Sequence, residues 1–442
     1  MATVEKQGYF TGWTLKTEGI IAPDERLPWG QSIFVGLQHV LAMFGATVLA
    51  PIIMGFDPNT AIFFSGIGTL VFFLIVGGRV PSYLGSSFSF IAVVIAASGY
   101  LGKGLNLHID VALGGIITAG VVYAIIGLIV IFVGYKWIEY IMPPAVTGVV
   151  VAVIGLNLAP VAISEAATSQ FDTWMALITV LAVALVAIYA PGPLRRLPIL
   201  IGGVIGYLIY LLFANAFGLG KPINFTALGQ AAWIGLPNFT APSFHPNAMI
   251  LIAPVAIILV AENLGHIKAV GAMTGRNLDK YLGRAFLGDG VSTIISASGG
   301  GTGLTTYAEN IGVMAVTRIY STVIFIIAAV VAILLGFCPK FGALIATIPV
   351  GVLGGLAIVL FGLIAATGGR IWVQNNVDFS KSRNLVTAAV ALTMGAGNFT
   401  INIGGFSLGG IGTATFSAII LYQLLRERGA DVQESPELEV EA

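Results

Sequence analysis

The sequence is dominated by apolar stretches about as long as a membrane is thick, joined by short polar connections. A helix needs about 20 mostly apolar residues to cross the hydrocarbon core of a bilayer. Of the 442 residues, 57% are hydrophobic and only 9% are charged, so a water-soluble protein of this length could not cover its surface with charge. The pattern predicts an all-α membrane protein surrounded by lipid.

We expect fourteen transmembrane segments. They lie at 31–53, 59–78, 81–98, 110–133, 142–163, 172–190, 198–217, 247–267, 285–299, 303–317, 319–337, 342–366, 384–399 and 406–425. The third, ninth, tenth and thirteenth segments are short or interrupted by Gly and polar residues, so their ends are the hardest to place.

The basic residues predict the orientation, because Lys and Arg favour cytoplasmic loops. With the N-terminus inside, seventeen of the 20 basic residues are cytoplasmic, and only Lys103, Lys221 and Lys340 lie outside. If 81–98 and 303–317 merely entered the membrane and returned, the split would fall to 12 against 8. We therefore expect both segments to cross and both termini to be cytoplasmic. The zero net charge suggests no nucleic-acid partner.

Two of these segments open with small, polar and β-compatible residues before turning apolar, namely 81–90 and 299–310. Irregular backbone at membrane depth persists only inside protein or beside a cavity. The two segments are the third and the tenth, seven apart, so two seven-span halves would lie in opposite orientations. This predicts an inverted-repeat transporter with extended stretches and half-helices at the substrate site. The alternative is that these Gly-rich segments only pack helices closely.

Ionisable residues inside a bilayer are costly and therefore mark functional sites. Glu262 and His266 are four apart in an apolar span, which places them on one helical face. Glu309 opens the tenth segment. A buried ion pair holding helices together is the alternative for the two glutamates, but no Lys or Arg lies in the apolar middle of a span to pair with them.

Two further ionisable residues leave two interpretations open. Asp289, near the start of the ninth segment, is either a functional carboxylate or an interfacial charge beside Arg284. His39, in the first segment, is either functional or a hydrogen-bonded packing residue. The sequence offers no metal-ligand cluster, no nucleophile–base pair and no cofactor motif, so an enzyme is not expected. Its one cysteine, Cys338, excludes an internal disulfide.

Carboxylates without a buried cation suit a neutral ligand rich in N–H donors, because charge-assisted hydrogen bonds are strong. Uracil, with two N–H groups and two carbonyls, is such a ligand. Backbone N–H groups at half-helix N-termini could donate to its carbonyls. Phe88 or Phe90 could stack on its planar ring. Two acidic groups would oppose an anion.

Three motifs resemble those of the nucleobase–ascorbate transporter family (nucleobase:cation symporter 2). The stretch from Glu309 to Arg318 resembles the family signature: Glu or Gln, Asn, one residue, Gly, four residues, Thr, and a basic or small residue. Gln38-His39 resembles the paired motif of the first span, and 261–266 resembles the eighth span. The resemblance covers nearly the whole chain.

The resemblance implies a fold of fourteen spans in two inverted repeats of seven, divided into core and gate domains, and often a homodimer formed through the gate. The expected divisions are a cytoplasmic N-terminal segment at 1–30, core domain at 31–133 and 247–337, gate domain at 134–217 and 342–425, and a cytoplasmic tail at 426–442.

The resemblance also implies roles for individual residues. Glu262 and Glu309 would bind the base, Phe88, Tyr307 and the backbone near Ala308 would complete the site, and His266 would join Glu262 in linking protonation to binding. Supporting positions are Gln38, His39, Asp289, Asn310, Thr317 and Arg318.

The expected function is secondary active import of uracil and related pyrimidines, thymine among them, by proton symport. Glu at position 309 favours uracil, because purine-selective members often carry Gln there. The alternatives are a xanthine or urate permease of the same family and, from another class, an anion exchanger or channel with a similar seven-plus-seven fold.

Overall fold

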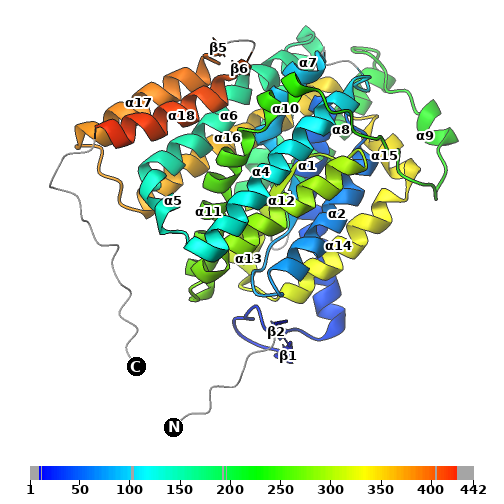
Figure 1. The fold of residues 1–442 in the computed structure, drawn as a ribbon. Coiled ribbons are helices and arrows are strands. Elements are labelled where there is room, and N and C mark those ends of the chain that lie inside the picture. Colours follow the sequence, from blue (N-terminus) through cyan, green and yellow to red (C-terminus); the bar gives the residue numbers. More distant parts are fainter. Residues whose placement is uncertain are drawn as a thin grey trace.

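The computed structural model describes residues 9–10, 12–100, 104–191, 194–195, 197–403 and 406–425. The predicted tail at 426–442, together with Lys103 and Arg196, lies outside them. The chain folds into an α-helical bundle (Figure 1). Its first half comprises β1 (Thr14–Leu15), β2 (Glu25–Arg26), α1 (Trp29–Met54), α2 (Pro58–Ile75), β3 (Leu84–Ser86), η1 (Phe88–Phe90), α3 (Ile91–Ser98), α4 (Ile109–Val133), α5 (Lys136–Ile141), α6 (Pro144–Ala166), α7 (Gln170–Tyr189), α8 (Pro198–Leu211) and the π-helical η3 (Leu212–Ala216).

The second half repeats much of this order. It comprises α9 (Thr226–Gln230), α10 (Pro246–Ile252), α11 (Val255–Thr274), η4 (Asp279–Tyr281), α12 (Leu282–Ser298), β4 (Leu304–Thr306), α13 (Ala308–Thr317), α14 (Thr322–Gly336), α15 (Pro339–Ile345), α16 (Val350–Gln374), α17 (Ser382–Ala396), β5 (Ile401–Ile403), β6 (Phe406–Leu408) and α18 (Gly410–Leu424). Every segment predicted to span the membrane contains one of these helices.

Several predicted boundaries are wrong. The segment expected at 342–366 is divided, because α15 ends before Pro349 and α16 begins after it; proline fixes φ and lacks an N–H donor. The segment expected at 247–267 is interrupted between α10 and α11, at Ala253 and Pro254, and continues to Gly275, whose left-handed conformation ends α11. The last expected segment begins with β6, so its helix starts only at Gly410.

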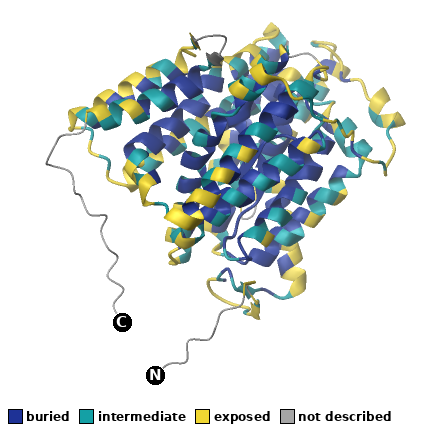
Figure 2. Ribbon diagram, in the orientation of Figure 1, coloured by how far each residue is buried: buried dark blue, intermediate teal, exposed yellow. Residues whose placement is uncertain are grey.

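The protein is a multi-pass membrane protein. Among the described residues, eight helices are long and apolar enough to cross a bilayer, or nine if α14 and α15, bent by 87°, form one span. Their outward faces are apolar as well: Leu177 and Leu181 of α7 are 52% and 57% exposed, which suits lipid better than water. Figure 2 shows the buried interior between these helices. The full count of fourteen crossings stays a prediction.

The helices pack in two groups. In one, α2 and α4 both pack on α12, and α14 packs on both α1 and α2. In the other, α6 packs on α16, α17 and α18, while α7 packs on α8 and α16. The groups meet where α11 contacts α6 and where α1 contacts α8 and α16. The division of the chain into core and gate domains stays a prediction.

The two irregular segments pair with each other in the middle of the bundle. Strands β3 and β4 are antiparallel, with Leu84 opposite Thr306 and Ser86 opposite Leu304. Each strand leads directly into a short helical stretch, as expected from the sequence. Their antiparallel pairing is what two oppositely oriented halves would produce.

Each strand is held by a threonine from the preceding helix in the same way. Thr69 Oγ1 of α2 accepts from Leu84 N at 2.9 Å and lies 3.3 Å from Leu84 O, while its proton has a nearer acceptor in Ser65 O at 2.8 Å. Thr293 Oγ1 of α12 accepts from Leu304 N at 3.0 Å and donates to Leu304 O at 3.2 Å. This matched pair of contacts supports the inverted-repeat prediction, since close packing alone does not require it.

We predict that Gly85→Ala disrupts this crossing. A Cβ at Gly85 would lie 2.5 Å from Tyr307 Cε2 and 2.6 Å from the Tyr307 hydroxyl oxygen, so the ring would have to move. Overpacking of this kind costs about 1–3 kcal/mol. Thermal unfolding of the purified protein should therefore begin at a lower temperature.

Gly312→Ala is the matched control for this change, because it adds the same methyl group to α13 where nothing lies within 4 Å. Alanine favours a helix over glycine by about 1 kcal/mol, so this variant should keep or raise the unfolding temperature. Equal destabilisation by both changes would contradict the predicted packing at Gly85.

Candidate binding site

The two predicted carboxylates come from helices on either side of the strand crossing. Glu262 lies in α11 and Glu309 is the second residue of α13; both are half-buried. Ser89 Oγ, on η1, lies 3.4 Å from Glu262 Oε2 and donates to it. Glu309 lies in the first turn of α13, where the helix dipole favours negative charge.

Neither glutamate forms an ion pair within the part of the chain that the structure describes. The ion pairs among the described residues involve other carboxylates, near the N-terminal segment and the end of α11. Glu262 and Glu309 lie close enough for their charges to interact with each other. The buried-ion-pair interpretation therefore does not hold for the described residues, and the two carboxyl groups are left with few protein donors.

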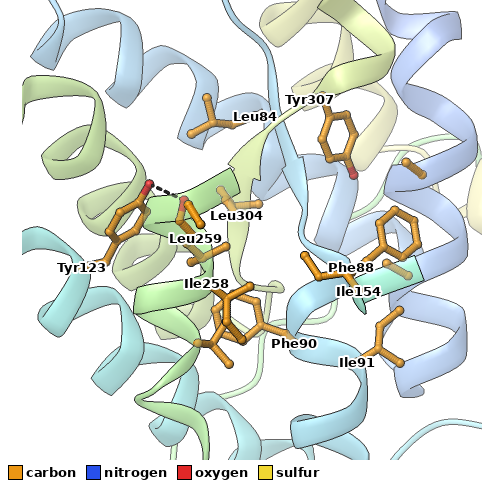
Figure 3. Packing of buried hydrophobic residues seen from close by; sticks show 14 of the residues in the cluster. Leu84, Phe88, Phe90, Ile91, Tyr123, Ile154, Ile258, Leu259, Leu304 and Tyr307 are labelled. Carbon is orange, nitrogen blue, oxygen red and sulfur yellow. Dashed lines mark hydrogen bonds between the residues drawn. The ribbon is translucent and has the colours of Figure 1, made fainter. Parts of the chain in front are cut away.

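Phe88 is the first residue of η1 and lies between Tyr307 and Ile91 in the view of Figure 3. It is 7% exposed, and its ring meets the ring of Phe361 edge-on, with centroids 5.6 Å apart. Phe90 is fully buried, and its ring lies directly against Gly303. Of the two phenylalanines, Phe88 is therefore the one whose position suits stacking on a ligand.

Tyr307 and Ala308 join β4 to α13. The Tyr307 hydroxyl donates to Ser86 O at 2.9 Å and accepts from Thr47 Oγ1 at 3.2 Å, so it fastens the crossing. Ala308 is the first residue of α13, and its N–H is one of the four that a helix leaves without an internal partner. The start of α13 can thus present backbone donors beside Glu309.

His266 belongs to a buried polar network. Its Nδ1 lies 2.8 Å from Thr306 Oγ1, which in turn donates to Asn263 Oδ1 at 3.3 Å. Asn263 Nδ2 donates to the Tyr123 hydroxyl at 3.0 Å and to Asp289 Oδ2 at 2.5 Å.

Asp289 is the inner end of this network. It is fully buried in α12, so the alternative of an interfacial charge beside Arg284 is wrong. Arg284 lies five residues earlier in α12, with its guanidinium 5.0 Å from the centroid of the Tyr9 ring. The sequence could not distinguish these cases, because an apolar run near its end looks the same whether it is buried or interfacial.

His39 and Asn310 join the first span to the signature. Asn310 Nδ2 donates to His39 Nδ1 at 3.0 Å and to His39 O at 3.1 Å, and the imidazole packs on Phe325 with centroids 4.8 Å apart. Buried Gln38 Nε2, His39 Nε2 and Asn310 Oδ1 have no partner among the described residues. His39 is thus a hydrogen-bonded packing residue that contacts Asn310, next to Glu309 in the chain; a direct role in transport stays a prediction.

The other end of the signature lies away from the carboxylates. Thr317 and Arg318 follow Glu309 by eight and nine residues, which is about 12–14 Å along a helix. Thr317 Oγ1 donates to Val313 O at 2.8 Å, and Arg318 is exposed in the left-handed conformation with φ of 55°. The structure therefore does not place these two supporting residues beside Glu309.

Sequence reasoning missed Ser89, Asn263 and Thr306 as partners of the site residues. All three are uncharged, so a search for ionisable residues in apolar spans passes over them. Asn263 stands inside the Glu262–His266 cluster, and Thr306 stands next to Tyr307. The sequence did offer a signal for Asn263 and Thr306, because each is a polar residue within or next to a motif already selected. Only the tertiary structure shows which side chains they contact.

Comparison with known sequences decides the family. The family model Xan_ur_permease, described as "Permease family", matches residues 30–404. The chain belongs to this permease family. It is 60% identical over 427 residues to the protein named "Putative pyrimidine permease RutG" of Escherichia coli K12, covering 96% of this chain and 97% of that one. This confirms the family relationship predicted from the signature.

Further relatives share less sequence over nearly the same length. The uracil permease of Paenibacillus larvae is 42% identical over 418 residues, covering 91% of this chain and 96% of that protein. The uracil permease of Bacillus caldolyticus is 40% identical over 414 residues, covering 90% and 93%.

Two solved structures share the fold of this permease. SLC26A9 superposes with a TM-score of 0.64 at 13% identity, covering 89% of this chain and 64% of that one. The transmembrane domain of the cyanobacterial bicarbonate transporter BicA gives a TM-score of 0.61 at 18% identity, covering 89% and 97%. At such low identity the likeness concerns the fold alone.

Proposed function

We propose that this permease imports uracil and related pyrimidine nucleobases across the bacterial inner membrane by proton symport. The observation that carries the proposal is the placement of Glu262 and Glu309 beside the β3–β4 crossing, without a cationic partner among the described residues. A neutral ligand with N–H donors would supply the hydrogen bonds that the two carboxylates lack.

Other groups of the site would suit the carbonyls and the flat ring of a pyrimidine. The first-turn N–H groups of α13, starting at Ala308, would donate to a carbonyl, and Phe88 would lie against the ring. Relatives at 60% and about 40% identity carry the names pyrimidine permease and uracil permease, which supports the same substrate class. Two negative charges would repel an anion, which disfavours anion exchange despite the shared fold.

Uptake of labelled uracil by cells lacking their own nucleobase permeases tests the substrate. We expect expression of this chain to restore uracil uptake, and excess unlabelled uracil or thymine to compete. Xanthine, labelled in parallel, tests the alternative within the family. Uptake of xanthine in place of uracil would overturn the pyrimidine assignment while leaving the permease family intact.

For the architecture we propose fourteen spans in two inverted repeats, with core and gate domains bounded as predicted, a homodimer, and both termini in the cytoplasm. The matched contacts of Thr69 and Thr293 support the repeats, and the distribution of basic residues supports the orientation. Since α11 continues to Thr274, the following cytoplasmic loop is shorter than 268–284.

Single cysteines test this orientation. We expect cysteines at Arg195 and Arg276, in a Cys338→Ala background, to resist membrane-impermeant thiol reagents in intact cells and to react after permeabilisation. A cysteine at Lys221, in the loop predicted to lie outside, is the matched control and should react without permeabilisation. Ready labelling of position 195 or 276 in intact cells would contradict the proposed topology.

A further inference from the structure

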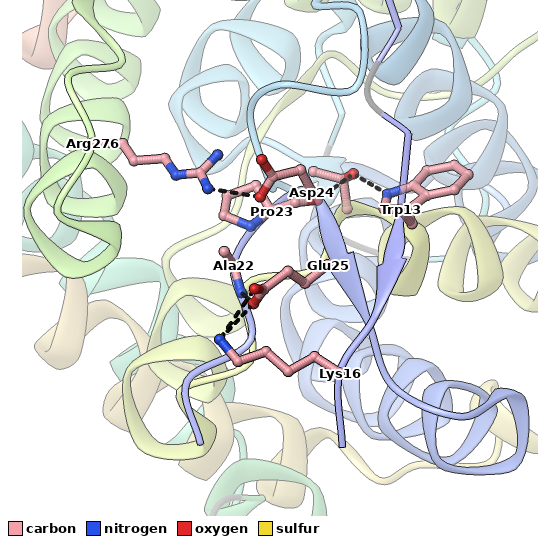
Figure 4. A network of polar contacts seen from close by, with 8 residues as sticks. Trp13, Lys16, Ala22, Pro23, Asp24, Glu25 and Arg276 are labelled. Carbon is pink, nitrogen blue, oxygen red and sulfur yellow. Dashed lines mark hydrogen bonds and ion pairs between the residues drawn. The ribbon is translucent and has the colours of Figure 1, made fainter. Parts of the chain in front are cut away.

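The N-terminal segment forms an ordered unit of its own, which we call the N-terminal strap (residues 12–28). Strands β1 and β2 pair in parallel, with Thr14 opposite Glu25 (Figure 4). Lys16 Nζ lies 3.0 Å from Glu25 Oε2, and the same oxygen accepts from Ala22 N at 2.8 Å. These contacts close the strap into a compact loop below α1 in Figure 1.

The strap binds the chain where α13 ends and α14 begins. Ile21 N donates to Arg318 O at 3.1 Å, and Tyr320 N donates to Ile21 O at 2.8 Å, forming a parallel bridge. Thr322 N, at the start of α14, donates to Pro23 O at 3.2 Å. The left-handed conformation of Arg318 ends α13 and directs the next residues into this pairing. The last residue of the signature therefore contacts the strap and not the carboxylates.

Apolar packing and further polar contacts hold the strap in place. Ile21 is 1% exposed and belongs to a cluster with Leu27, Val35, Val323 and Ile324, separate from the main core. The Trp13 indole N–H donates to Thr322 Oγ1 at 2.9 Å. Burial of the apolar Ile21 side chain in this cluster therefore attaches the strap to the start of α14.

The strap is also attached to α11, the helix that carries Glu262. Asp24 Oδ1 lies 2.7 Å from Arg276 Nη2, just past Gly275 at the end of α11 (Figure 4). Both side chains are about 40% exposed, and an ion pair that solvent screens contributes little to stability. The strap thus holds the end of α13 firmly and the end of α11 more weakly.

We propose that the N-terminal strap positions the binding site, by holding the ends of α11 and α13 in a fixed relation so that Glu262 and Glu309 meet the same ligand. Helix α13 has only 10 residues, so displacement of its end by a few ångströms moves Glu309. A ligand bound by both helices is sensitive to their spacing, because hydrogen bonds weaken steeply with distance and angle. Ile21, Arg318 and Asp24 are positioning residues in this sense. The affinity part of the proposal rests on the proposed function.

The test compares Ile21→Asp with Ile20→Asp, the same change one residue away at a side chain that is 51% exposed. Trypsin cleavage after Lys16 and Arg26 reports release of the strap. Spin labels on cysteines at Ala272 and Val316, both exposed near the ends of α11 and α13, report their spacing in a Cys338→Ala background. Binding of labelled uracil to the purified protein reports affinity.

We expect Ile21→Asp to admit trypsin, to broaden or shift the distance distribution between the labels, and to raise the Kd for uracil at least fivefold. Ile20→Asp should match the parent in all three. If Ile21→Asp aggregates, Ile21→Ala against Ile20→Ala replaces the pair, with the same directions expected.

Three results overturn the proposal: a strap that stays resistant to trypsin in the Ile21 variants, a released strap with an unchanged label distance, or a changed distance with unchanged uracil affinity. Failure of the parent protein to bind uracil would instead refute the proposed function. The trypsin and distance measurements would still decide whether the strap holds α11 and α13, because neither needs a ligand.

Discussion

Replacing Glu309 with alanine is expected to abolish high-affinity uracil binding. The change removes a carboxylate acceptor at the start of α13 and leaves a substrate N–H without a partner. An unsatisfied buried polar group costs about 1–3 kcal/mol, and more when its partner was charged. That corresponds to a loss of roughly tenfold to over a hundredfold in affinity, measurable with labelled uracil on purified protein.

Glu309→Gln and Glu18→Ala are the controls for this experiment. Glutamine keeps the shape and one acceptor oxygen, so its effect should fall between those of the parent and alanine. Glu18 is exposed on the N-terminal strap, outside the site, and its removal should leave the affinity within about twofold. Near-normal uracil binding by Glu309→Ala would show that the site lies elsewhere.

Replacing Glu262 with glutamine is expected to abolish proton-driven accumulation of uracil. Uracil is neutral near pH 7, so the membrane potential alone cannot concentrate it. One co-transported proton supplies about 2.3 kcal/mol per 100 mV, which sustains roughly a fiftyfold gradient. We expect Glu262 to carry that proton. His266, which is hydrogen-bonded to Thr306, lies one helical turn from Glu262 and would assist.

Proteoliposomes separate coupling from binding. With an inward proton gradient and no sodium, the parent should accumulate uracil, and Glu262→Gln should only equilibrate it. Glutamine cannot release or take up a proton, yet it preserves the side-chain shape beside Ser89. His266→Gln, which removes the assisting imidazole, should slow accumulation. Uptake that follows sodium and ignores both the pH gradient and an uncoupler would refute the proton mechanism.

The local sequence was enough to predict the membrane spans, the extended stretches and the family signature, because each of these lies within a single segment of the chain. The apolar runs predict a multi-pass membrane protein because each span must satisfy its own backbone hydrogen bonds and present apolar side chains to lipid. The Ser- and Gly-rich openings at 81–90 and 299–310 predicted extended stretches, and β3 and β4 lie there. The signature from Glu309 to Arg318 predicted the family, because its spacing is contained within one short helix.

The sequence predicted the ends of helices and the burial of single residues less well, because both depend on how neighbouring elements pack. Pro349 divides one predicted span into two helices. Helix α11 runs past its predicted end at 267 and stops only at Gly275. Asp289 could not be assigned from its neighbours in the chain; its burial comes from the packing of α12 on α2 and α4.

Only the tertiary structure decided which distant residues share a site. Ser86 and Thr302 are 216 positions apart and hydrogen-bonded, and Asn310 meets His39 across 271 positions. Such contacts follow from strand pairing and helix packing, and no local pattern specifies them. The same holds for Arg318, which belongs to the same motif as Glu309 but whose carbonyl accepts from Ile21 N of the N-terminal strap. A helix separates its two ends in space, so adjacency in a motif does not mean a shared site.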